Sequence, residues 1–337
     1  MNKKVRWGIL GAAKIAVKSV IPAMQAGEFC EISAIASRDS AKAKRVADDL
    51  SIPKFYGSYE ELLNDETIEA VYNPLPNNLH LEWTAKAARS GKHVLCEKPL
   101  GMNADEVRKL IEIRDKTGVK IHEAFMVRTH PQWLAVRDLV ERGRIGKVNA
   151  ITMFFSYFND DKTNIRNKIE NGGGALMDIG CYCINLARFI FADEPRKVSG
   201  FVERDAETAI DKLTSAMLDF PHGHAAFTCS TQLAPYQRMQ ILGTKGRIEV
   251  EIPVNIPPDT PTRIFIDDGA DFYGANIETI EFPATDKFTI QGDLFSQAIL
   301  ENSAQTVSLE DSFANMAVID AVFRAAKSGN RETPETL

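Results

Sequence analysis

Two polar side chains on one predicted helix are the strongest candidates for chemistry. Asp178 and Tyr182 follow three consecutive glycines at 172–174 and are four residues apart, so a helix would present both on the same face. A phenol can transfer a proton, and a carboxylate can accept a hydrogen bond from a substrate hydroxyl. The simpler alternative is structural, with Tyr182 donating a hydrogen bond to the aspartate on its own helix face.

Lys98 is the third candidate, because it directly follows a predicted strand in the sequence Cys96-Glu97-Lys98-Pro99. The proline after it restricts the lysine backbone to an extended or turn conformation. By position alone, a lysine in such a loop is typical of the protein surface. A catalytic role for Lys98 therefore depends on what surrounds it.

The turn after the first predicted strand has the pattern of a phosphate-binding turn. The segment reads G-x-A-x-x-A when it is registered on Gly11, a degraded form of the G-x-G-x-x-G fingerprint. Gly11 can form the tight turn, Ala13 occupies the position where the backbone approaches a pyrophosphate, and Ala16 still allows close helix packing. Phosphates would bind at the N-terminus of the following helix, where unpaired N–H groups favour anions.

The end of the second predicted strand indicates which dinucleotide would bind there. A site for NAD usually places a carboxylate at this point, whereas this chain has Ser37 and Arg38, with Lys42 one helical turn later. A hydroxyl and a guanidinium suit the 2′-phosphate of NADP. Asp39 complicates the prediction, because a change of register by one residue would direct it at the ribose. Arg38 as an ordinary solvated loop residue is the alternative.

Strands and helices alternate through the first part of the chain, which favours a doubly wound parallel sheet. The predicted strands span residues 5–10, 31–36, 70–72, 93–96 and 120–124, and the predicted helices span 14–26, 40–50, 79–90 and 103–117. The loop at 73–80, with two prolines and several asparagines, lies at the carboxyl edge of this sheet, where ligands bind. Asn78 in this loop also suits the N-cap of the next helix.

After about residue 122 the pattern changes to strands joined by glycine-bearing turns, which indicates a mostly antiparallel sheet. Strands are predicted at 148–158, 197–202, 213–220, 224–230, 238–242, 247–252 and 263–266, and a closing helix at 308–327. We therefore expect two domains, a dinucleotide-binding Rossmann domain at 1–122 and an α+β domain at 123–337.

Composition excludes several functional classes. The 337 residues have a formal net charge of −6 without a basic run, which makes nucleic acid an unsuitable partner. No stretch has the length and uniform apolarity expected of a membrane span, and the five cysteines are too few and scattered for a disulfide framework. Cys181-x-Cys183 is half of a metal motif without a second ligand pair nearby, so we expect no metal. A reduced, cytoplasmic setting is expected.

Taken together, these motifs resemble the family of glucose–fructose oxidoreductase and inositol 2-dehydrogenase (the Gfo/Idh/MocA family). The most specific segments are AxxGKHVLCEKP at 88–99 and GGGALxDIGxY at 172–182. Members of the inositol dehydrogenase type carry a histidine where this chain has Tyr182. The segment EAFMVRTHP at 123–131 looks most like the NADP-dependent xylose dehydrogenase and dimeric dihydrodiol dehydrogenase branches.

The resemblance implies a Rossmann domain followed by a domain with an open-faced antiparallel sheet, through which a homodimer or homotetramer would form. It implies Lys98 and Tyr182 as catalytic residues, and Asp178, Arg128 and His130 as substrate-binding residues. NADP is the expected cofactor, with NAD possible as a substitute. The expected cofactor-binding residues are Gly11, Ala12, Ala13, Lys14, Ile15, Ser37, Arg38, Lys42, Leu75, Pro76, Asn77, Asn78, His80, Glu97, Lys98 and Arg166.

The implied reaction is hydride transfer between a carbon that bears a hydroxyl and nicotinamide. A free phenol, with a pKa near 10, is a weak base at neutral pH. A lysine cation about 4 Å away, at an effective dielectric constant near 20, favours the phenolate by roughly 4 kcal/mol before desolvation. Lys98 would supply this correction for Tyr182.

Four functions remain open. We expect oxidation of an aldopyranose such as xylose or glucose at C1, because the predicted pocket edge is rich in hydrogen-bonding side chains. The alternatives are reduction of a ketone on a sugar, or oxidation of a trans-dihydrodiol. A dinucleotide-binding sensor without turnover is the fourth, and the presence of Lys98 and Tyr182 speaks against it.

Overall fold

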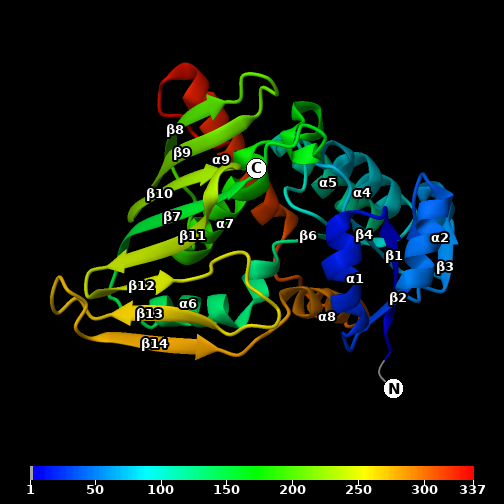
Figure 1. Ribbon diagram of the computed structural model, residues 1–337, viewed down its shortest axis with the longest axis horizontal. Coiled ribbons are helices and arrows are strands. Elements are labelled where there is room, and N and C mark those ends of the chain that lie inside the picture. The colour runs from blue at the N-terminus through cyan, green and yellow to red at the C-terminus, as the bar shows by residue number, and fades with distance from the viewer. Residues whose placement is uncertain (1–2) are drawn as a thin grey trace. The chain divides into compact units, whose positions relative to one another are not determined.

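The protein divides into two compact units, which are described separately below. The computed structural model describes residues 3–337 (Figure 1). Unit 1 contains the residues up to Met126 together with Asp286–Ser312, and unit 2 contains Val127–Thr285 and Phe313–Leu337. The first crossing lies within a few residues of the expected boundary at 122/123. The later return of Asp286–Ser312 to unit 1 was not expected from the sequence.

Unit 1 is built on a parallel six-stranded sheet in the order β3-β2-β1-β4-β5-β6. The strand order reverses between β1 and β4, and ligands of doubly wound sheets bind at the carboxyl ends of the strands beside such a switch point. The expected Rossmann architecture is therefore confirmed. The strands are β1 Val5–Leu10, β2 Cys30–Ala36, β3 Lys54–Tyr56, β4 Ala70–Asn73, β5 His93–Cys96 and β6 Ile121–Glu123.

One helix of unit 1, α5, begins and ends at the capping residues that the sequence indicates, whereas Asn78 lies within a 3₁₀ turn and is not the N-cap of the helix that follows it. Asn103 accepts a hydrogen bond from Glu106 N at the start of α5, and Gly118 ends that helix with a φ of 71°. The first helix begins with a π-helical turn at Ala16–Val20, which continues into α1. The helices are α1 Ile21–Gln25, α2 Ser40–Asp49, α3 Tyr59–Leu63, α4 His80–Arg89, α5 Ala104–Thr117 and α8 Lys287–Leu300, with a 3₁₀ turn at Asn77–Leu79.

Helix α8 belongs to unit 1 because it packs on the first two strands through both polar and apolar contacts. The indole of Trp7, which is fully buried, donates a hydrogen bond to Ser296 Oγ over 3.1 Å. The Asp293 carboxylate accepts hydrogen bonds from the backbone N–H groups of Glu28 and Phe29. These contacts link positions more than 260 residues apart, which is why a reading of local pattern could not assign α8 to the first domain.

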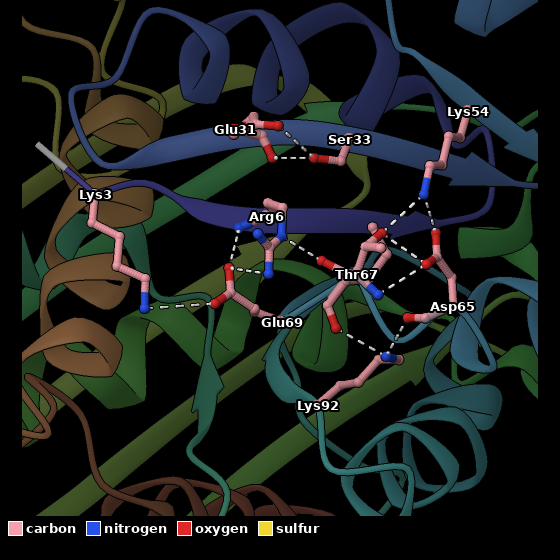
Figure 2. Close-up of polar contacts among 10 residues, drawn as sticks. Lys3, Arg6, Glu31, Ser33, Lys54, Asp65, Thr67, Glu69 and Lys92 are labelled. Atoms are coloured by element: carbon pink, nitrogen blue, oxygen red, sulfur yellow. Dashed lines mark hydrogen bonds and ion pairs between the residues drawn. The ribbon is translucent and has the colours of Figure 1, made fainter. Parts of the chain in front are cut away.

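A network of charged and polar side chains lies at the amino ends of the parallel strands (Figure 2). Asp65 accepts hydrogen bonds from Lys54 Nζ over 2.8 Å and from Thr67 Oγ1 over 2.7 Å. Lys92, which is buried, donates to the carbonyl oxygens of Asp65 and Ile68. Burial alone would raise the pKa of Asp65, but the hydrogen bonds it accepts outweigh this effect and hold its pKa below the usual range.

Unit 2 is built on an eight-stranded sheet in the order β14-β13-β12-β11-β7-β10-β9-β8. Every neighbouring pair is antiparallel except β7 and β10, so the expected mostly antiparallel sheet is confirmed. The strands are β7 Val148–Phe158, β8 Lys197–Arg204, β9 Asp211–Phe220, β10 Gly223–Ser230, β11 Gln232–Gly243, β12 Gly246–Val250, β13 Thr262–Asp267 and β14 Ile277–Phe282.

Helices of unit 2 cover one face of this sheet. The indole of Trp133 in α6 (Pro131–Glu141) donates to Pro253 O, and Val322 of α9 (Leu309–Ser328) lies directly over Gly200 of β8. The segment Ile169–Phe191 includes α7 (Cys181–Phe191) and is apolar and long enough to cross a membrane. Because 83% of its most apolar window is buried inside the protein, it has the character of a core helix.

The opposite face of the sheet carries exposed side chains, and we call it the open face. Phe201 of the edge strand β8 is 81% exposed and Tyr236 of β11 is 53% exposed, which is unusual for large aromatic side chains on a sheet. They border a shallow hollow of about 540 Å³. The hollow is lined by Thr152, Met153, Phe154, Ser199, Phe201, Ser215, Ala216, Met217, Ala226, Phe227, Thr228, Tyr236, Arg238 and Gln240.

Replacing Asp65 tests the network at the amino ends of the strands. Because the pKa of this carboxyl is depressed on folding, its contribution to stability is present above the usual value of 3.8 and is lost as the pH falls through the folded value. Asp65→Asn should therefore lower the free energy of unfolding by about 1 kcal/mol at pH 7, with solvent screening at Lys54 keeping the loss small. The deficit should shrink near pH 3, as measured by urea unfolding.

Asp48→Asn is the matched control, because Asp48 pairs with Lys44 on the exposed surface of α2. Such surface pairs on a helix contribute only about 0.3–0.5 kcal/mol. An Asp65→Asn deficit that is no larger than that of the control, or that does not depend on pH, would contradict the role of the network.

Candidate active site

The turn after β1 has the geometry that a dinucleotide phosphate requires. Gly11 has a φ of +99°, which L-residues with a side chain rarely adopt, and its N–H donates to Ala36 O. A Cβ at this position would lie 3.0 Å from Leu75 Cδ2, so a side chain would crowd the turn. Ala12 and Ala13 are half-buried, and helical backbone begins at Lys14. The backbone from Gly11 to Ile15 is therefore a tight turn that leads into a helix, and its contact with a dinucleotide phosphate stays a prediction.

After the end of β2, the carboxylate of Asp39 caps a helix, and this differs from the ribose contact that a change of register would have given it. Asp39 is the N-cap of α2, and its side chain accepts a hydrogen bond from Lys42 N over 3.0 Å. Ser37 is buried, and its hydroxyl oxygen accepts the N–H of Asp39 over 3.2 Å. Arg38 is exposed at the same edge. A contact of Ser37 or Arg38 with a 2′-phosphate stays a prediction.

His80 joins two loops at the carboxyl edge of the sheet. Its Nδ1 lies 2.8 Å from Pro99 O and its Nε2 lies 2.7 Å from Leu75 O, and the side chain is fully buried. Burial lowers the pKa of His80 to about 4, and the two carbonyl contacts oppose this only in part. The ring therefore has no unused nitrogen for a cofactor. His80 therefore connects the loop at 73–80 to the turn that contains Lys98.

Further hydrogen bonds fix the backbone on either side of Lys98. Tyr72 in β4 donates from its hydroxyl to Glu97 Oε1 over 2.6 Å, and Glu97 N donates to Asn73 O. On the other side, Leu100 N donates to Glu123 Oε1 over 2.8 Å, after a cis bond between Lys98 and Pro99. Lys98 is thus presented on a turn that is tied to β4 and β6, and its side chain is half-buried.

In unit 2, Asp178 and Tyr182 lie on one continuous helical segment, but with a change of helix type between them. Asp178 lies in a π-helical turn, Leu176–Gly180, and Tyr182 lies in the first turn of α7. Such π turns occur frequently at functional sites. Tyr182 is 5% exposed, and its ring packs edge-on against Phe155 of β7 at a centroid distance of 6.5 Å.

The carboxylate of Asp178 is held by two side chains from outside its own helix. Tyr157 in β7 donates to its Oδ2 over 2.5 Å, and Arg166 Nε lies 3.1 Å and 3.2 Å from its two oxygens. Burial first, and then the charge of Asp178, raise the pKa of the Tyr157 phenol, so this group stays a donor. Arg166, which the sequence assigned to the cofactor, lies on the Asp178 carboxylate in this unit.

The other two residues that were expected to bind substrate have structural partners. His130 is buried and is the N-cap of α6, where its Nδ1 accepts the N–H of Gln132 over 3.2 Å. The guanidinium of Arg128 stacks on the Phe189 ring at 4.4 Å, and its Nη1 lies 3.4 Å from Asn185 Oδ1. Arg128 and His130 therefore help to anchor the entry into α6 against α7, and a substrate contact for either stays a prediction.

The glycine-rich loop before this helix is shaped by a buried carboxylate. Asp211 at the start of β9 accepts hydrogen bonds from Leu176 N over 2.7 Å and from Thr214 Oγ1 over 2.8 Å. Burial raises the pKa of Asp211 to about 6, so the group is mostly ionised at neutral pH. A negative charge at the first N–H groups of a helix is favourable. Asp211 therefore fixes the point at which the segment with Asp178 and Tyr182 begins.

Comparison with known proteins identifies the family. The model of the oxidoreductase family with an NAD-binding Rossmann fold matches residues 5–125, and the model of the GFO/IDH/MocA C-terminal domain matches residues 133–249. This chain belongs to the Gfo/Idh/MocA family of oxidoreductases. The family expected from the sequence is thus confirmed, and with it the assignment as an NAD(P)-dependent oxidoreductase.

Two curated relatives cover nearly the whole chain. An uncharacterised oxidoreductase of Rhizobium meliloti is 46% identical over 330 residues, which cover 98% of this chain and 99% of the relative. A D-xylose 1-dehydrogenase (NADP⁺) of Haloferax volcanii is 39% identical over 328 residues, or 96% of this chain and 98% of the relative. Among solved structures, a 3-ketoreductase of Actinomadura kijaniata in complex with NADP and TDP-benzene has a TM-score of 0.89 at 30% identity, covering 96% of this chain and 98% of that one.

Two residues of this family site were not anticipated from the sequence. Side chains alternate between the two faces of a strand, and Tyr157 shares its face with Ile151, Met153 and Phe155, which are buried. This alternation could have predicted that Tyr157 lies on the face of the sheet that the helices cover. Asp211 gave no comparable signal, because its partner Leu176 is 35 residues away.

Gly174 provides a test of the link between Asp211 and the helix. Its φ is +121°, and a Cβ there would lie 1.9 Å from Asp211 Oδ1, so Gly174→Ala would displace the carboxylate from Leu176 N. We expect Gly174→Ala to lower the free energy of unfolding by more than the roughly 1–2 kcal/mol that a positive φ alone would cost. Chemical denaturation measures this loss.

Gly91→Ala is the control, since Gly91 has a φ of +74° but nothing within 4 Å of an added Cβ. Equal losses in the two variants would show that the contact with Asp211 has no energetic consequence.

Proposed function

We propose that this protein oxidises an aldopyranose at C1 with NADP as the cofactor, and that Tyr182 accepts the proton of the C1 hydroxyl. The observation that carries this proposal is the arrangement on one helical segment of unit 2. A buried tyrosine lies four residues from a carboxylate that Arg166 and Tyr157 hold in place. A fixed acceptor beside a proton-transferring phenol suits a polyhydroxylated substrate, because it selects which carbon reacts. The similarity to a D-xylose 1-dehydrogenase supports the choice of an aldose.

In this proposal, Tyr182 transfers the proton and Lys98 stabilises its deprotonated form. Tyr182 takes the proton as the hydride leaves the substrate carbon, and returns it in the reverse reaction. Lys98 stabilises the phenolate form of Tyr182 through its positive charge, which requires the two side chains to meet during turnover. Bound NADP supplies the hydride acceptor. The tied turn around Lys98 supports this role, because a cation on a rigid turn loses little freedom when it acts.

The choice of NADP over NAD rests on Ser37, Arg38 and Lys42. A guanidinium makes strong charge-assisted hydrogen bonds to a phosphate, whereas an unmodified ribose calls for a carboxylate acceptor. Asp39, the one carboxylate nearby in sequence, caps α2. The NADP bound to the similar 3-ketoreductase supports this preference.

Reduction of a ketone on a sugar is the second candidate. The similarity to the 3-ketoreductase, at 30% identity over 96% of this chain, favours it specifically. The same groups would serve, with Tyr182 donating a proton to the carbonyl oxygen.

We also propose that the open face of the eight-stranded sheet joins copies of this chain into a homodimer or homotetramer. Large aromatic and aliphatic side chains are exposed there, with Phe201 at 81% and Met217 at 52%. A contiguous exposed apolar patch is typical of a protein interface. Charged substitution at Phe201 should lower the molecular mass in solution if this face is the interface.

Substitution of the proposed acid/base pair tests the mechanism. Tyr182→Phe and Lys98→Met should each lower kcat by at least about 10², the usual contribution of general acid–base catalysis, while Tyr182→Phe should still bind cofactor. Steady-state rates and cofactor titration measure the two effects. Tyr273→Phe is the control, because Tyr273 is 94% exposed and should retain full activity. Near-normal turnover in Tyr182→Phe would remove this tyrosine from the mechanism.

A substrate panel tests the reaction itself. Initial rates should be measured with xylose, glucose, inositol, a trans-dihydrodiol and ketosugars, each with NADP(H) and NAD(H). We expect aldose oxidation with NADP to be fastest. A deoxy sugar that lacks a contacted hydroxyl should lose far more activity than one that lacks a carbon outside the contacts, because buried polar groups would be left unpaired. Activity confined to the dihydrodiol or to ketone reduction would overturn the substrate choice.

A further inference from the structure

Strand β7 contacts the helical segment that carries Asp178 and Tyr182 at two points. The Phe155 ring packs edge-on against the Tyr182 ring, and the Tyr157 hydroxyl donates a hydrogen bond to Asp178 Oδ2 over 2.5 Å. Residues two apart on a strand are separated by about 7 Å along its axis, and residues four apart on a helix by about 6 Å. The spacing on the strand therefore matches the spacing on the helix, so that both contacts can form together.

The backbone of β7 is a firm support for these contacts, because this strand lies inside the sheet. It pairs with β10 from Ala150 to Ser156 and with β11 from Val148 to Phe158, so both of its edges are hydrogen-bonded. A strand that is paired on both edges cannot change its register without breaking both sets of hydrogen bonds. The Tyr157 hydroxyl therefore reaches the Asp178 carboxylate from a fixed backbone.

Arg166, the other partner of this carboxylate, lies in a more exposed environment. It belongs to a 3₁₀ turn at Ile165–Asn167, and its side chain is 45% exposed, compared with 12% for the side chain of Asp178. Water and salt screen an exposed ion pair, which then contributes little free energy. The Tyr157 phenol is half-buried, and burial together with the charge of Asp178 raises its pKa, so it stays a donor. Tyr157 is therefore the partner that constrains the carboxylate more strongly.

We propose that Tyr157 is a positioning residue that sets the orientation of the Asp178 carboxylate beside Tyr182, and that it thereby determines which sugars the site accepts. This inference rests on the aldose oxidation proposed above, in which Asp178 accepts a hydrogen bond from a substrate hydroxyl. Without the Tyr157 hydroxyl, the carboxylate can rotate, and a sugar hydroxyl no longer meets it in one fixed geometry. Loss of that geometry reduces the rate of a reaction that depends on alignment.

The test compares an intact sugar with its deoxy analogues, using the sugar that the unaltered protein turns over fastest. Asp178→Asn first identifies the contacted hydroxyl, because removing that hydroxyl should lower kcat/KM in the unaltered protein but have little effect in this variant. Tyr157→Phe, which keeps the ring, should then lower kcat/KM for the intact sugar by about tenfold, the scale of a hydrogen bond to a charged group. The value for the deoxy sugar should stay within about twofold, since this sugar does not contact Asp178.

Tyr56→Phe is the matched control, because the Tyr56 hydroxyl also donates to a carboxylate, Asp65 Oδ2, over 2.8 Å in unit 1. This control should leave kcat/KM for both sugars unchanged. Arg166→Gln should reduce the discrimination between the two sugars less than Tyr157→Phe does, since Arg166 is the exposed partner. An equal or larger effect of Arg166→Gln would assign the positioning role to Arg166 and contradict the proposal.

The remaining outcomes separate the role of Tyr157 from the proposed function. A purely structural role would lower kcat/KM equally for the intact and the deoxy sugar, and that result would overturn the proposal. If no hydroxyl shows a dependence on Asp178, the substrate contact assumed in the proposed function is refuted, and the role of Tyr157 with it. A dependence on Asp178 that persists in full in Tyr157→Phe refutes the role of Tyr157 alone.

Discussion

The buried carboxylate of Asp211 is the interaction on which unit 2 depends most directly. It accepts the N–H of Leu176 at the start of the helical segment and the hydroxyl of Thr214 from its own strand. A helix begins with N–H groups that lack partners inside the helix, and a carboxylate from a distant strand satisfies one of them here. The position of this segment along the sheet follows from that contact, and so does the position of every side chain on it.

In unit 1, a buried imidazole ring connects two loops. His80 lies between two main-chain carbonyls, one from each loop at the carboxyl edge of β4 and β5. Burial favours the neutral ring and lowers the pKa of His80 to about 4. A neutral imidazole has a single N–H and donates to one of these carbonyls, whereas the protonated ring would donate to both. In both units, a buried residue with a structural role therefore holds a segment that carries candidate catalytic residues. His80 holds the turn with Lys98, and Asp211 holds the helical segment with Tyr182.

Local patterns in the sequence predicted the architecture well, and they failed where long-range contacts decide. The parallel order, the strands from Val148 to Ile266 and the cap of α5 at Asn103 follow from periodicity and capping chemistry. Strand β3, with three residues, and strand β14, with mostly exposed ones, are too short or too polar for such a signal. Helix α8 was missed because its contacts with Trp7 and Phe29 are not visible locally. Asp178 was recognised as a site residue, but its partners Tyr157 and Arg166 come from other elements.

The charged network at the amino ends of the parallel strands has an evolutionary consequence. Lys54, Asp65 and Lys92 secure the sheet at one edge (Figure 2). The loops that carry Gly11, Arg38 and Lys98 follow the carboxyl ends of the strands, at the other edge. Substitutions in those loops leave the contacts of the anchoring edge unchanged. Selection can therefore explore new specificities on a scaffold whose folding is secured independently, as the varied activities of the similar enzymes illustrate.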